Sequence, residues 1–133
     1  MERKEPYATQ EEFNKRVIHY HDVPLIELAP GLKSHIVSAE KITVSFVTAD
    51  PGSQVGTHRH EAEQILVVMD GTCDAIVAGK LYHLGKGDVV IIPPNIEHGV
   101  YFSDTGCRVI DIFSPSRQDL VAKLEAVKKG LET

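Results

Sequence analysis

The chain of 133 residues lacks any cluster of basic side chains, and its formal net charge at pH 7 is −5. Nucleic acids and anionic membranes bind proteins through fields of Lys and Arg, so neither is an expected partner. Long apolar runs are also absent, since segments such as Val89 to Ile92 are far too short to cross a bilayer, and the charged N-terminus does not resemble a secretory signal. These absences predict a cytoplasmic protein.

Cysteine is scarce, and internal repeats and low-complexity tracts are absent. The two cysteines, Cys73 and Cys107, stand in separate strand-like segments without a metal-binding spacing, so we expect buried free thiols. At this length, folding can remove roughly two-thirds of the unfolded chain's surface from water, which is enough for one core. The sequence therefore predicts a single domain over residues 1–133.

Short β-branched and apolar segments, broken by Gly, Pro and Asp, fill the chain from about residue 25 to residue 113. Such a pattern, repeated about every ten residues, is typical of an all-β sandwich or barrel. Asp70-Gly71 and Ala78-Gly79-Lys80 are predicted hairpin turns, because glycine readily adopts positive φ. The expected strands are Leu25–Leu28, Lys33–Val37, Ile42–Ala49, Val55–His60, Gln64–Met69, Cys73–Val77, Leu81–Leu84, Val89–Ile92, His98–Phe102 and Cys107–Phe113.

Two helices are expected outside this core of residues 25–113. Thr9 and Glu12 have the spacing of a capping box, which predicts a short helix from Gln10 to about Ile18. A second helix is expected at about residues 116–130, with its apolar side on the barrel or on a partner subunit. Its apolar residues recur at intervals of three and four. They are Leu120, Val121, Leu124, Val127 and Leu131.

Two histidines one residue apart, His58 and His60, lead directly into an apolar segment. Alternate residues of a strand share a face, so both imidazoles point to one side, and the same parity brings Gln64 inward and turns Glu63 away. His98 begins a later strand. Imidazole nitrogens and a carboxamide oxygen together suit a transition-metal ion. A histidine pair of this kind can also be an incidental surface feature.

These segments resemble the two sequence motifs of the cupin superfamily. The chain departs from them at Gln64, where most cupins have glutamate, at Asn95, where glycine is usual, and at Phe102, where asparagine is common. The residues that fit are Gly52, His58, His60, Gln64 and Gly71 in the first motif, and Gly87, Pro93 and His98 in the second.

The cupin resemblance implies a fold, a cofactor and an assembly. The fold is the all-β cupin double-stranded β-helix, a jelly-roll barrel, here with short N-terminal and C-terminal helices. The cofactor is one divalent metal ion (Zn, Ni, Mn, Fe or Co), and its ligands would be His58, His60, Gln64 and His98. The assembly is a homodimer, with the N-terminal segment or the C-terminal helix at its interface.

A carboxylate interrupts the last apolar strand, where Asp111 shares a face with Val109 and Phe113. Burying an unpaired charge is costly, so such a residue reaches water, has an Arg partner or is functional, and the pattern leaves these alternatives open. Arg117 taken by itself is a solvated residue at the helix entrance. The helix is expected to carry an exposed ion pair between Asp119 and Lys123.

The run Asp111-x-Phe113-Ser-Pro-x-Arg117 resembles the small single-domain cupins of pectin and alginate breakdown, the KdgF type. One departure is the spacing between His60 and Gln64, which is three residues here and often four in that family. The resemblance implies linearisation of a 4,5-unsaturated uronate to a keto sugar acid. In that reaction Asp111 would move protons, Arg117 would bind the substrate carboxylate and Phe113 would form an apolar wall.

Two other functions fit the same sequence. One is a metal-dependent dioxygenase or lyase of a small organic molecule, although oxygen activation generally benefits from an anionic ligand, which Gln64 does not supply. The other is a non-catalytic cupin that binds a metabolite. The remaining histidines are expected at the surface or at the edge of the pocket, and they are His19, His21, His35 and His83.

Overall fold

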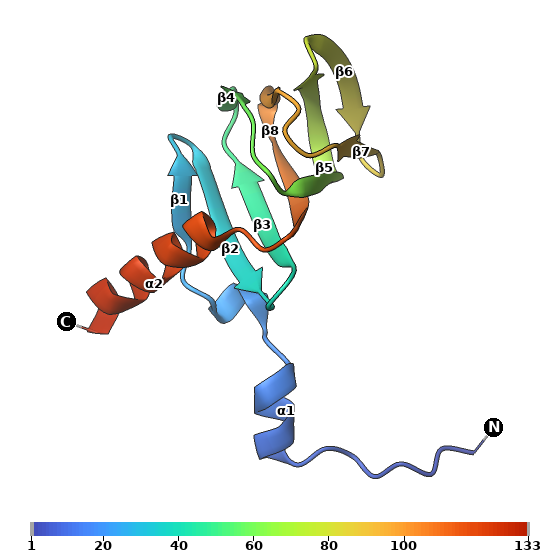
Figure 1. The fold of residues 1–133 in the computed structure, drawn as a ribbon, viewed down its shortest axis with the longest axis vertical. Helices are drawn as coiled ribbons and strands as arrows, with labels where there is room; N and C mark the ends of the chain where they lie inside the picture. The colour runs from blue at the N-terminus through green and yellow to red at the C-terminus, as the bar shows by residue number, and fades with distance from the viewer. Residues whose placement is uncertain (1, 133) are drawn as a thin grey trace.

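Antiparallel strands form the body of the protein, with one helix near each end of the chain (Figure 1). The computed structural model describes residues 2–132. Its elements in chain order are α1 (Gln10–Arg16), the 3-10 turn η1 (Tyr20–Asp22), β1 (Ile26–Ala29), β2 (Leu32–Ser38), β3 (Thr43–Ala49), β4 (Gln54–His58), β5 (Glu63–Val77), β6 (Lys80–Gly85), β7 (Val89–Ile92), β8 (His98–Ser114) and α2 (Gln118–Glu132).

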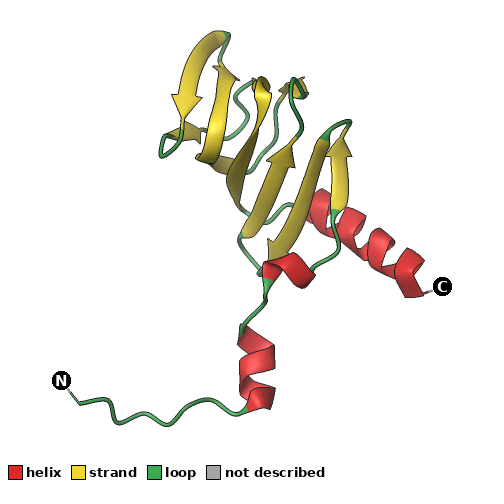
Figure 2. Ribbon diagram, turned by 180° about the vertical axis from the view of Figure 1, so that it is seen from behind, coloured by secondary structure: helices red, strands yellow, loops and turns green. Residues whose placement is uncertain are grey.

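The strands are hydrogen-bonded in the order β1-β2-β3-β8-β5-β6, while β4 pairs with β8 and β7 pairs with β5. The two long strands, β5 and β8, run antiparallel along their whole length, from Glu63 opposite Ser114 to Val77 opposite His98. Seen from behind, the strands form the body and α2 extends from one side of it (Figure 2). This architecture confirms the predicted all-β fold with a helix near each end.

The hairpin predicted at Asp70-Gly71 is wrong, because β5 continues through it. Gly71 has φ +80°, as expected, but it lies in an irregularity between β5 and β8, where a Cβ would collide with the carbonyl oxygen of Gly106. Positive φ serves a bulge as well as a turn. β8 likewise runs on where two strands were predicted. The second turn is confirmed, with positive φ at Ala78 and Gly79.

The inward side chains form two apolar clusters. The larger fills the barrel, and it includes the free thiol of Cys73, whose pKa burial raises to about 12. Cys107 is also buried and free, so the expectation for both thiols is confirmed. The smaller cluster lies at one end of the barrel, where α2 packs its apolar side on inward residues of the sheet. Its members are Ile26, Ile36, Ala62, Phe113, Leu120 and Leu124.

The two helices differ in what they contact. α2 lies against β1 and β2, whereas α1 stands clear of the body and has no buried residue (Figure 1). The predicted capping box of α1 is confirmed, because Thr9 and Glu12 each bond the other's backbone N–H, at 3.2 and 2.9 Å. Among residues 2–132, neither helix has the length and apolar character needed to span a membrane.

Candidate metal centre

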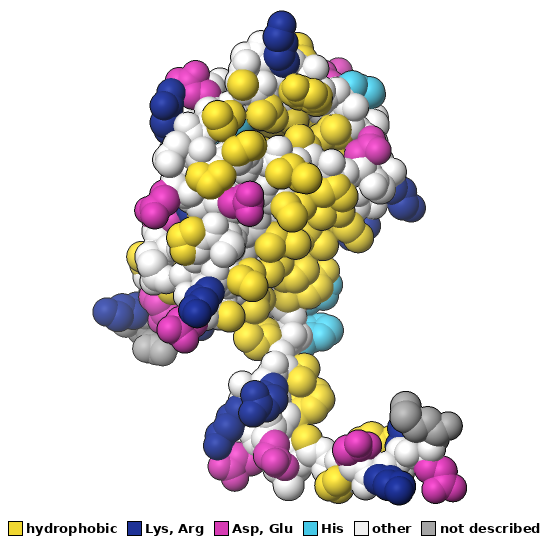
Figure 3. Space-filling model, turned by 45° about the vertical axis from the view of Figure 1, so that its right-hand side comes forward, with side chains coloured by type: hydrophobic (Ala, Val, Ile, Leu, Met, Phe, Trp, Pro, Cys, Tyr) yellow, Lys and Arg dark blue, Asp and Glu magenta, His cyan; other side chains and the backbone are white. Residues whose placement is uncertain are grey.

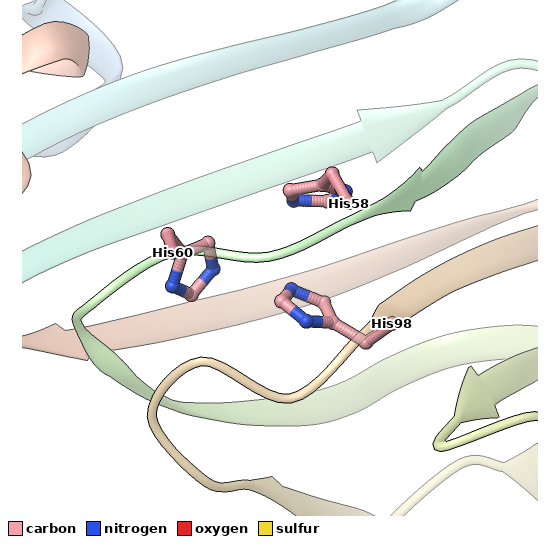
Figure 4. Close-up of side chains that lie close together, drawn as sticks. All are labelled: His58, His60 and His98. Carbon is pink, nitrogen blue, oxygen red and sulfur yellow. The ribbon is translucent and has the colours of Figure 1, made fainter.

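Three histidines from two separate segments of the chain turn their rings toward one another (Figure 4). His58 ends β4, His60 lies in the loop that follows, and His98 begins β8. Their ligand nitrogens all lie within 4.8 Å of one another. The ring centroids of His58 and His98 are 4.4 Å apart, and those of His60 and His98 are 4.7 Å apart. This geometry could hold a metal ion.

A glycine permits the close approach of β4 to β8 that brings two of the rings together. His58 is paired with His98 in the strand register, and Gly99 follows directly. A Cβ at Gly99 would lie 2.7 Å from the carbonyl oxygen of Val55 on β4 and 3.3 Å from the carbonyl carbon of Gly56. Any side chain at this position would therefore push β4, and with it His58, away from His98.

All three histidines are held in one tautomer by backbone carbonyl oxygens. Because a carbonyl oxygen only accepts, each Nδ1 must carry the proton, and each neutral ring then has a lone pair at Nε2. Metal-binding histidines are commonly oriented by such a bond from the other ring nitrogen. The carbonyl oxygens belong to Gly56, Ala62 and Ile96, at 2.9, 2.8 and 2.8 Å from Nδ1 of His58, His60 and His98 respectively.

Gln64 directs a fourth lone pair at the histidines. Its amide Nε2 donates to Oδ1 of Asp111 at 2.9 Å, which turns the amide oxygen toward the rings. That oxygen, Oε1, lies 3.0 Å from Nε2 of His60. Because Nδ1 of His60 donates its proton to a carbonyl oxygen, Nε2 of this ring is an acceptor, as is Oε1 of Gln64. A cation nearby would attract the lone pairs of both atoms.

Burial favours the neutral, ligand-ready form of two of the histidines. It lowers the pKa of His60, which the positive charge of Arg117 lowers further, and it lowers the pKa of His98. Among the described residues, the buried Nε2 of His98 has no hydrogen-bond partner. A buried acceptor without a partner is costly, and a divalent cation would satisfy it. The donors of this cluster therefore fit a divalent metal ion.

Asp111 lies on the inward side of β8, directly opposite Ser45 of β3 and Leu66 of β5. Burial raises the pKa of its carboxyl to about 6, while the amide of Gln64 and the charge of Arg117 act in the opposite direction. The sequence left open whether Asp111 reaches water, has an Arg partner or is functional. In the structure its carboxyl faces a cavity and accepts a hydrogen bond from Gln64.

Arg117 extends over the ring of Phe113, with its guanidinium carbon 4.8 Å from the ring centroid. Its Nε and Nη2 donate to the two carboxylate oxygens of Asp119, at 2.9 and 2.7 Å. These bonds are the main cause of the lowered pKa of Asp119. The ion pair expected between Asp119 and Lys123 is therefore wrong, since Asp119 holds the guanidinium.

A cavity of about 210 Å³ lies beside these side chains. Asp111 lies on its wall, as do Gln64 and Arg117. A cavity with apolar walls and a few convergent polar groups is typical of a site for a small molecule. Much of the apolar wall consists of Leu28, Leu32, Val47, Leu66, Val100 and Phe102.

The structure places all the predicted site residues around one end of the barrel. The sequence did not reveal that Asp119 and Lys123 also line the cavity, because both were interpreted as an exposed pair. Ser45 was missed as well, although a serine at an inward position of β3 is a signal that could have been found. Its hydroxyl lies 2.6 Å from that of Ser34, and both serines are buried.

An antiparallel β-barrel with three converging histidines is typical of small metal-binding β-barrel proteins. A comparison of the sequence with protein families gives the same class. Residues 45–113, about half of the chain, match the cupin domain family. The chain belongs to the cupin family.

Within this family, the chain is similar to the pectin degradation protein KdgF of Dickeya dadantii (strain 3937). The two are 29% identical over 102 residues, which cover 75% of this chain and 93% of the relative. The structure of KdgF from Halomonas sp. aligns with a TM-score of 0.70 at 29% identity, over 75% of this chain and 93% of that one. These matches confirm the predicted resemblance to cupins of the KdgF type.

A third relative is an RmlC-like cupin from Shewanella frigidimarina NCIMB 400. Its crystal structure aligns with a TM-score of 0.72 at 27% identity, over 78% of this chain and 96% of that chain. All three relatives are matched over nearly their full length and over at least three quarters of this chain.

Proposed function

We propose that the protein is a metal-dependent enzyme that opens the ring of a 4,5-unsaturated uronate and yields an open-chain keto sugar acid. The observation that carries this proposal is that a carboxyl group, Asp111, and a cation, Arg117, share one small cavity with two histidines of the cluster, His58 and His98. The similarity to KdgF, a pectin degradation protein by name, supports the substrate class.

The expected ligands carry no charge, because Gln64 stands where a carboxylate is usual. A divalent ion held by three imidazoles and one amide would keep its full charge and supply a strong Lewis acid. Such a donor set suits proton chemistry on sugar oxygens better than oxygen activation. The chain itself positions this set, since Gln64 is oriented by Asp111 and each histidine by a carbonyl oxygen.

Ring opening is an isomerisation, so every proton that is removed is returned. The anomeric hydroxyl loses a proton, and the bond between the anomeric carbon and the ring oxygen breaks as that oxygen takes one. The enol so formed takes a proton on carbon, loses the one on oxygen and becomes a ketone. We assign these transfers to Asp111, because its carboxyl lines the cavity and is held in place by Gln64.

The acid group of the substrate would be recognised at the other side of the cavity. Asp119 engages Nε and Nη2 of Arg117, and Nη1 has no partner among the described residues. We assign Nη1 and the ammonium of Lys123, which also lines the cavity, to the substrate carboxylate. Phe113 lies beneath the guanidinium and would present an apolar wall to the sugar ring.

The test is turnover of unsaturated uronates, followed by the loss of the ultraviolet absorbance of their conjugated double bond. We expect elemental analysis to find one divalent ion per chain (Zn, Ni, Mn, Fe or Co), and a chelator to abolish turnover until metal is returned. Asp111→Asn should remove turnover and retain substrate binding, whereas Arg117→Ala should mainly raise KM. A metal-loaded protein that binds uronates without converting them would be a binding module, which contradicts the proposal.

The expected setting of this enzyme is the cytoplasm, and its expected assembly is a homodimer, as the cupin resemblance implies. If the protein instead consumes oxygen in the presence of catechols or diketones, it is a dioxygenase and the uronate proposal is wrong. An oxygen electrode reading on the metal-loaded protein distinguishes the two reactions, because isomerisation consumes no oxygen.

A further inference from the structure

A sugar acid carries hydroxyl groups as well as a carboxylate, and each hydroxyl that binding buries needs a hydrogen-bond partner. Hydrophobic side chains cover a broad area of the face of the body seen in Figure 3, so this surface offers few such partners. The cavity beside the histidines is the better place to look for them. Most of its wall is apolar as well, which leaves only a few polar side chains to consider.

Most polar side chains of the cavity wall already have a task. The histidines direct Nε2 toward the metal position, and Gln64 donates to Asp111. The charged side chains at the other side of the cavity, Arg117 among them, are assigned to the substrate carboxylate. Ser45 is the remaining polar side chain among the described residues that line the cavity.

The hydroxyl of Ser45 lies beside the carboxyl of Asp111. Ser45 is on the inward side of β3 and is directly paired with Asp111 of β8. Directly paired residues of antiparallel strands share a face, with Cβ atoms about 4.5–5.5 Å apart. Among residues 2–132, no hydrogen bond joins the two side chains, since the carboxyl accepts from Gln64 and the hydroxyl contacts Ser34. Both groups are therefore available to one ligand in the cavity.

Ser34 fixes the direction in which Ser45 donates. The two Oγ atoms are 2.6 Å apart, and Ser34 is 0% exposed. Within the described part of the chain, the Ser34 hydroxyl has no other hydrogen-bond partner. If its proton pointed away from Ser45, that proton would be buried without an acceptor, which is costly. Ser34 therefore donates to Ser45, and the proton of Ser45 is left for an acceptor in the cavity.

We propose that Ser45 is a specificity-determining residue, which donates a hydrogen bond to the substrate hydroxyl on C2, next to the anomeric carbon. The inference rests on the proposed function, in which the carboxyl of Asp111 acts on the anomeric hydroxyl. Hydroxyls on neighbouring carbons lie side by side, as do the side chains of Asp111 and Ser45. A sugar with both hydroxyls can therefore meet both side chains at once.

The surroundings of Ser45 make this bond selective. Val47 is the next inward residue of β3, and Leu66 of β5 is directly opposite Asp111. Both are apolar and line the cavity, so neither can bind a hydroxyl. The bond from Ser34 polarises the Ser45 hydroxyl and makes it a better donor. A substrate without the C2 hydroxyl leaves this buried donor unpaired, and a site of this kind rejects such an analogue.

The test compares the 4,5-unsaturated uronate with its 2-deoxy analogue as substrates of the metal-loaded protein. We expect the natural chain to prefer the hydroxylated substrate by about 10-fold in kcat/KM, the value of one hydrogen bond. Ser45→Ala should remove this preference, because KM rises for the hydroxylated substrate alone. A purely structural effect of the substitution would lower turnover of both substrates equally and leave the preference unchanged.

Ser38→Ala is the matched control. Ser38 of β2 also shares a hydrogen bond with a hydroxyl of β3, that of Thr43, at 2.8 Å. Neither is among the described residues that line the cavity, so the preference should persist. Ser45→Ala also leaves the hydroxyl of Ser34 buried without a partner and should lower the melting temperature. The double variant Ser34→Ala/Ser45→Ala removes both hydroxyls, so it should recover stability and still lack the preference.

A preference that persists in Ser45→Ala and in the double variant overturns the proposal, while turnover that depends on Asp111 would leave the proposed function standing. If the natural chain converts neither substrate, the proposed function is wrong. Calorimetry with galacturonate, a saturated uronate, and its 2-deoxy analogue then makes the same comparison. A binding preference that Ser45→Ala removes supports the role of Ser45. Equal binding of the two sugars by the natural chain, or binding of neither, overturns it.

Discussion

The inner and outer faces of the same strands depart from the usual distribution of side chains in opposite ways. The inner face buries polar groups, with Gln64 at 6% and His98 at 4% exposure. The outer face exposes apolar groups, with Ile65 at 36% and Ile91 at 64%. Because side chains alternate along a strand, neighbouring residues such as Gln64 and Ile65 belong to these two different surfaces.

This contrast indicates that each face carries a function that packing alone does not explain. A buried polar group costs free energy unless it is paired, and the histidine nitrogens are aimed at one point with lone pairs instead of protons. An exposed apolar group gains when it is covered by another surface. A cation would satisfy the buried polar groups of the inner face.

The largest expected effect comes from removing an inner ligand. His58→Ala should abolish stoichiometric metal binding and lower turnover by at least about 100-fold, because even the groups that orient ligands contribute 10–100-fold. His58 is exposed, so the fold should persist. The control is His83→Ala at the exposed edge of β6, which should change neither quantity. Equal metal content in the two variants would contradict the assignment of His58 as a metal ligand.

A charge change at the inner face should separate metal binding from chemistry. Gln64→Glu should retain the metal, since a carboxylate is an ordinary ligand. It should lower turnover by about 10–100-fold, because the negative charge weakens the Lewis acid and the hydrogen bond from the amide to Asp111 is lost. Glu63→Gln, one residue earlier and exposed, is the matched control. Metal analysis and turnover are measured together. A Gln64→Glu protein with full turnover would contradict the role of a neutral shell.

A backbone contact should have a smaller effect. Gly99→Ala should weaken metal binding by about 10-fold and destabilise the fold by about 1–3 kcal/mol, because the added Cβ meets the carbonyl oxygen of Val55 at 2.7 Å. Gly85→Ala is the control, since a Cβ there has nothing within 4 Å. Metal titration and thermal melting measure the two effects. If both variants bind metal as the natural chain does, the approach of β4 to β8 does not position His58.

The smallest expected effect is that of Asp119→Asn. The bonds from Arg117 lower the pKa of Asp119, so their stabilisation is present above the unfolded pKa of about 4 and is lost as the pH falls through the lower, folded value. The cost should stay below about 1 kcal/mol at pH 7, because the side chain of Asp119 is 63% exposed. Melting at pH 7 and pH 2 should show the difference from the natural chain disappearing in acid.

The same variant also tests the position of Arg117. With the proposed function, Asp119→Asn should raise KM for an acidic substrate a few-fold and leave kcat unchanged, because the guanidinium loses its anchor and remains charged. Gln118→Ala, one residue earlier and exposed, serves as the control. A change in kcat without a change in KM would mean that Asp119 acts in the chemistry and not in binding.

Much of the fold and of the site could be predicted because the side chains of a strand alternate. The alternation of side chains along the strand predicted that Gln64 points inward and Glu63 outward. In the structure Gln64 is buried and Glu63 is exposed. The capping box located the start of α1. Parity could not show that β5 continues through Asp70-Gly71, because a bulge and a turn both need a residue with positive φ. The roles of the site residues stay predictions.

The sequence by itself determined which side chains share a face, since alternation and capping depend on neighbours along the chain. Only the tertiary structure decided which faces meet. The pairing of β4 with β8 brings His58 to His98, and the hydrogen bond between Gln64 and Asp111 joins residues 47 positions apart. The tertiary structure also showed that Asp119 holds Arg117 and that α1 has no buried residue. Contacts of this kind depend on how distant segments pack, and no local pattern records them.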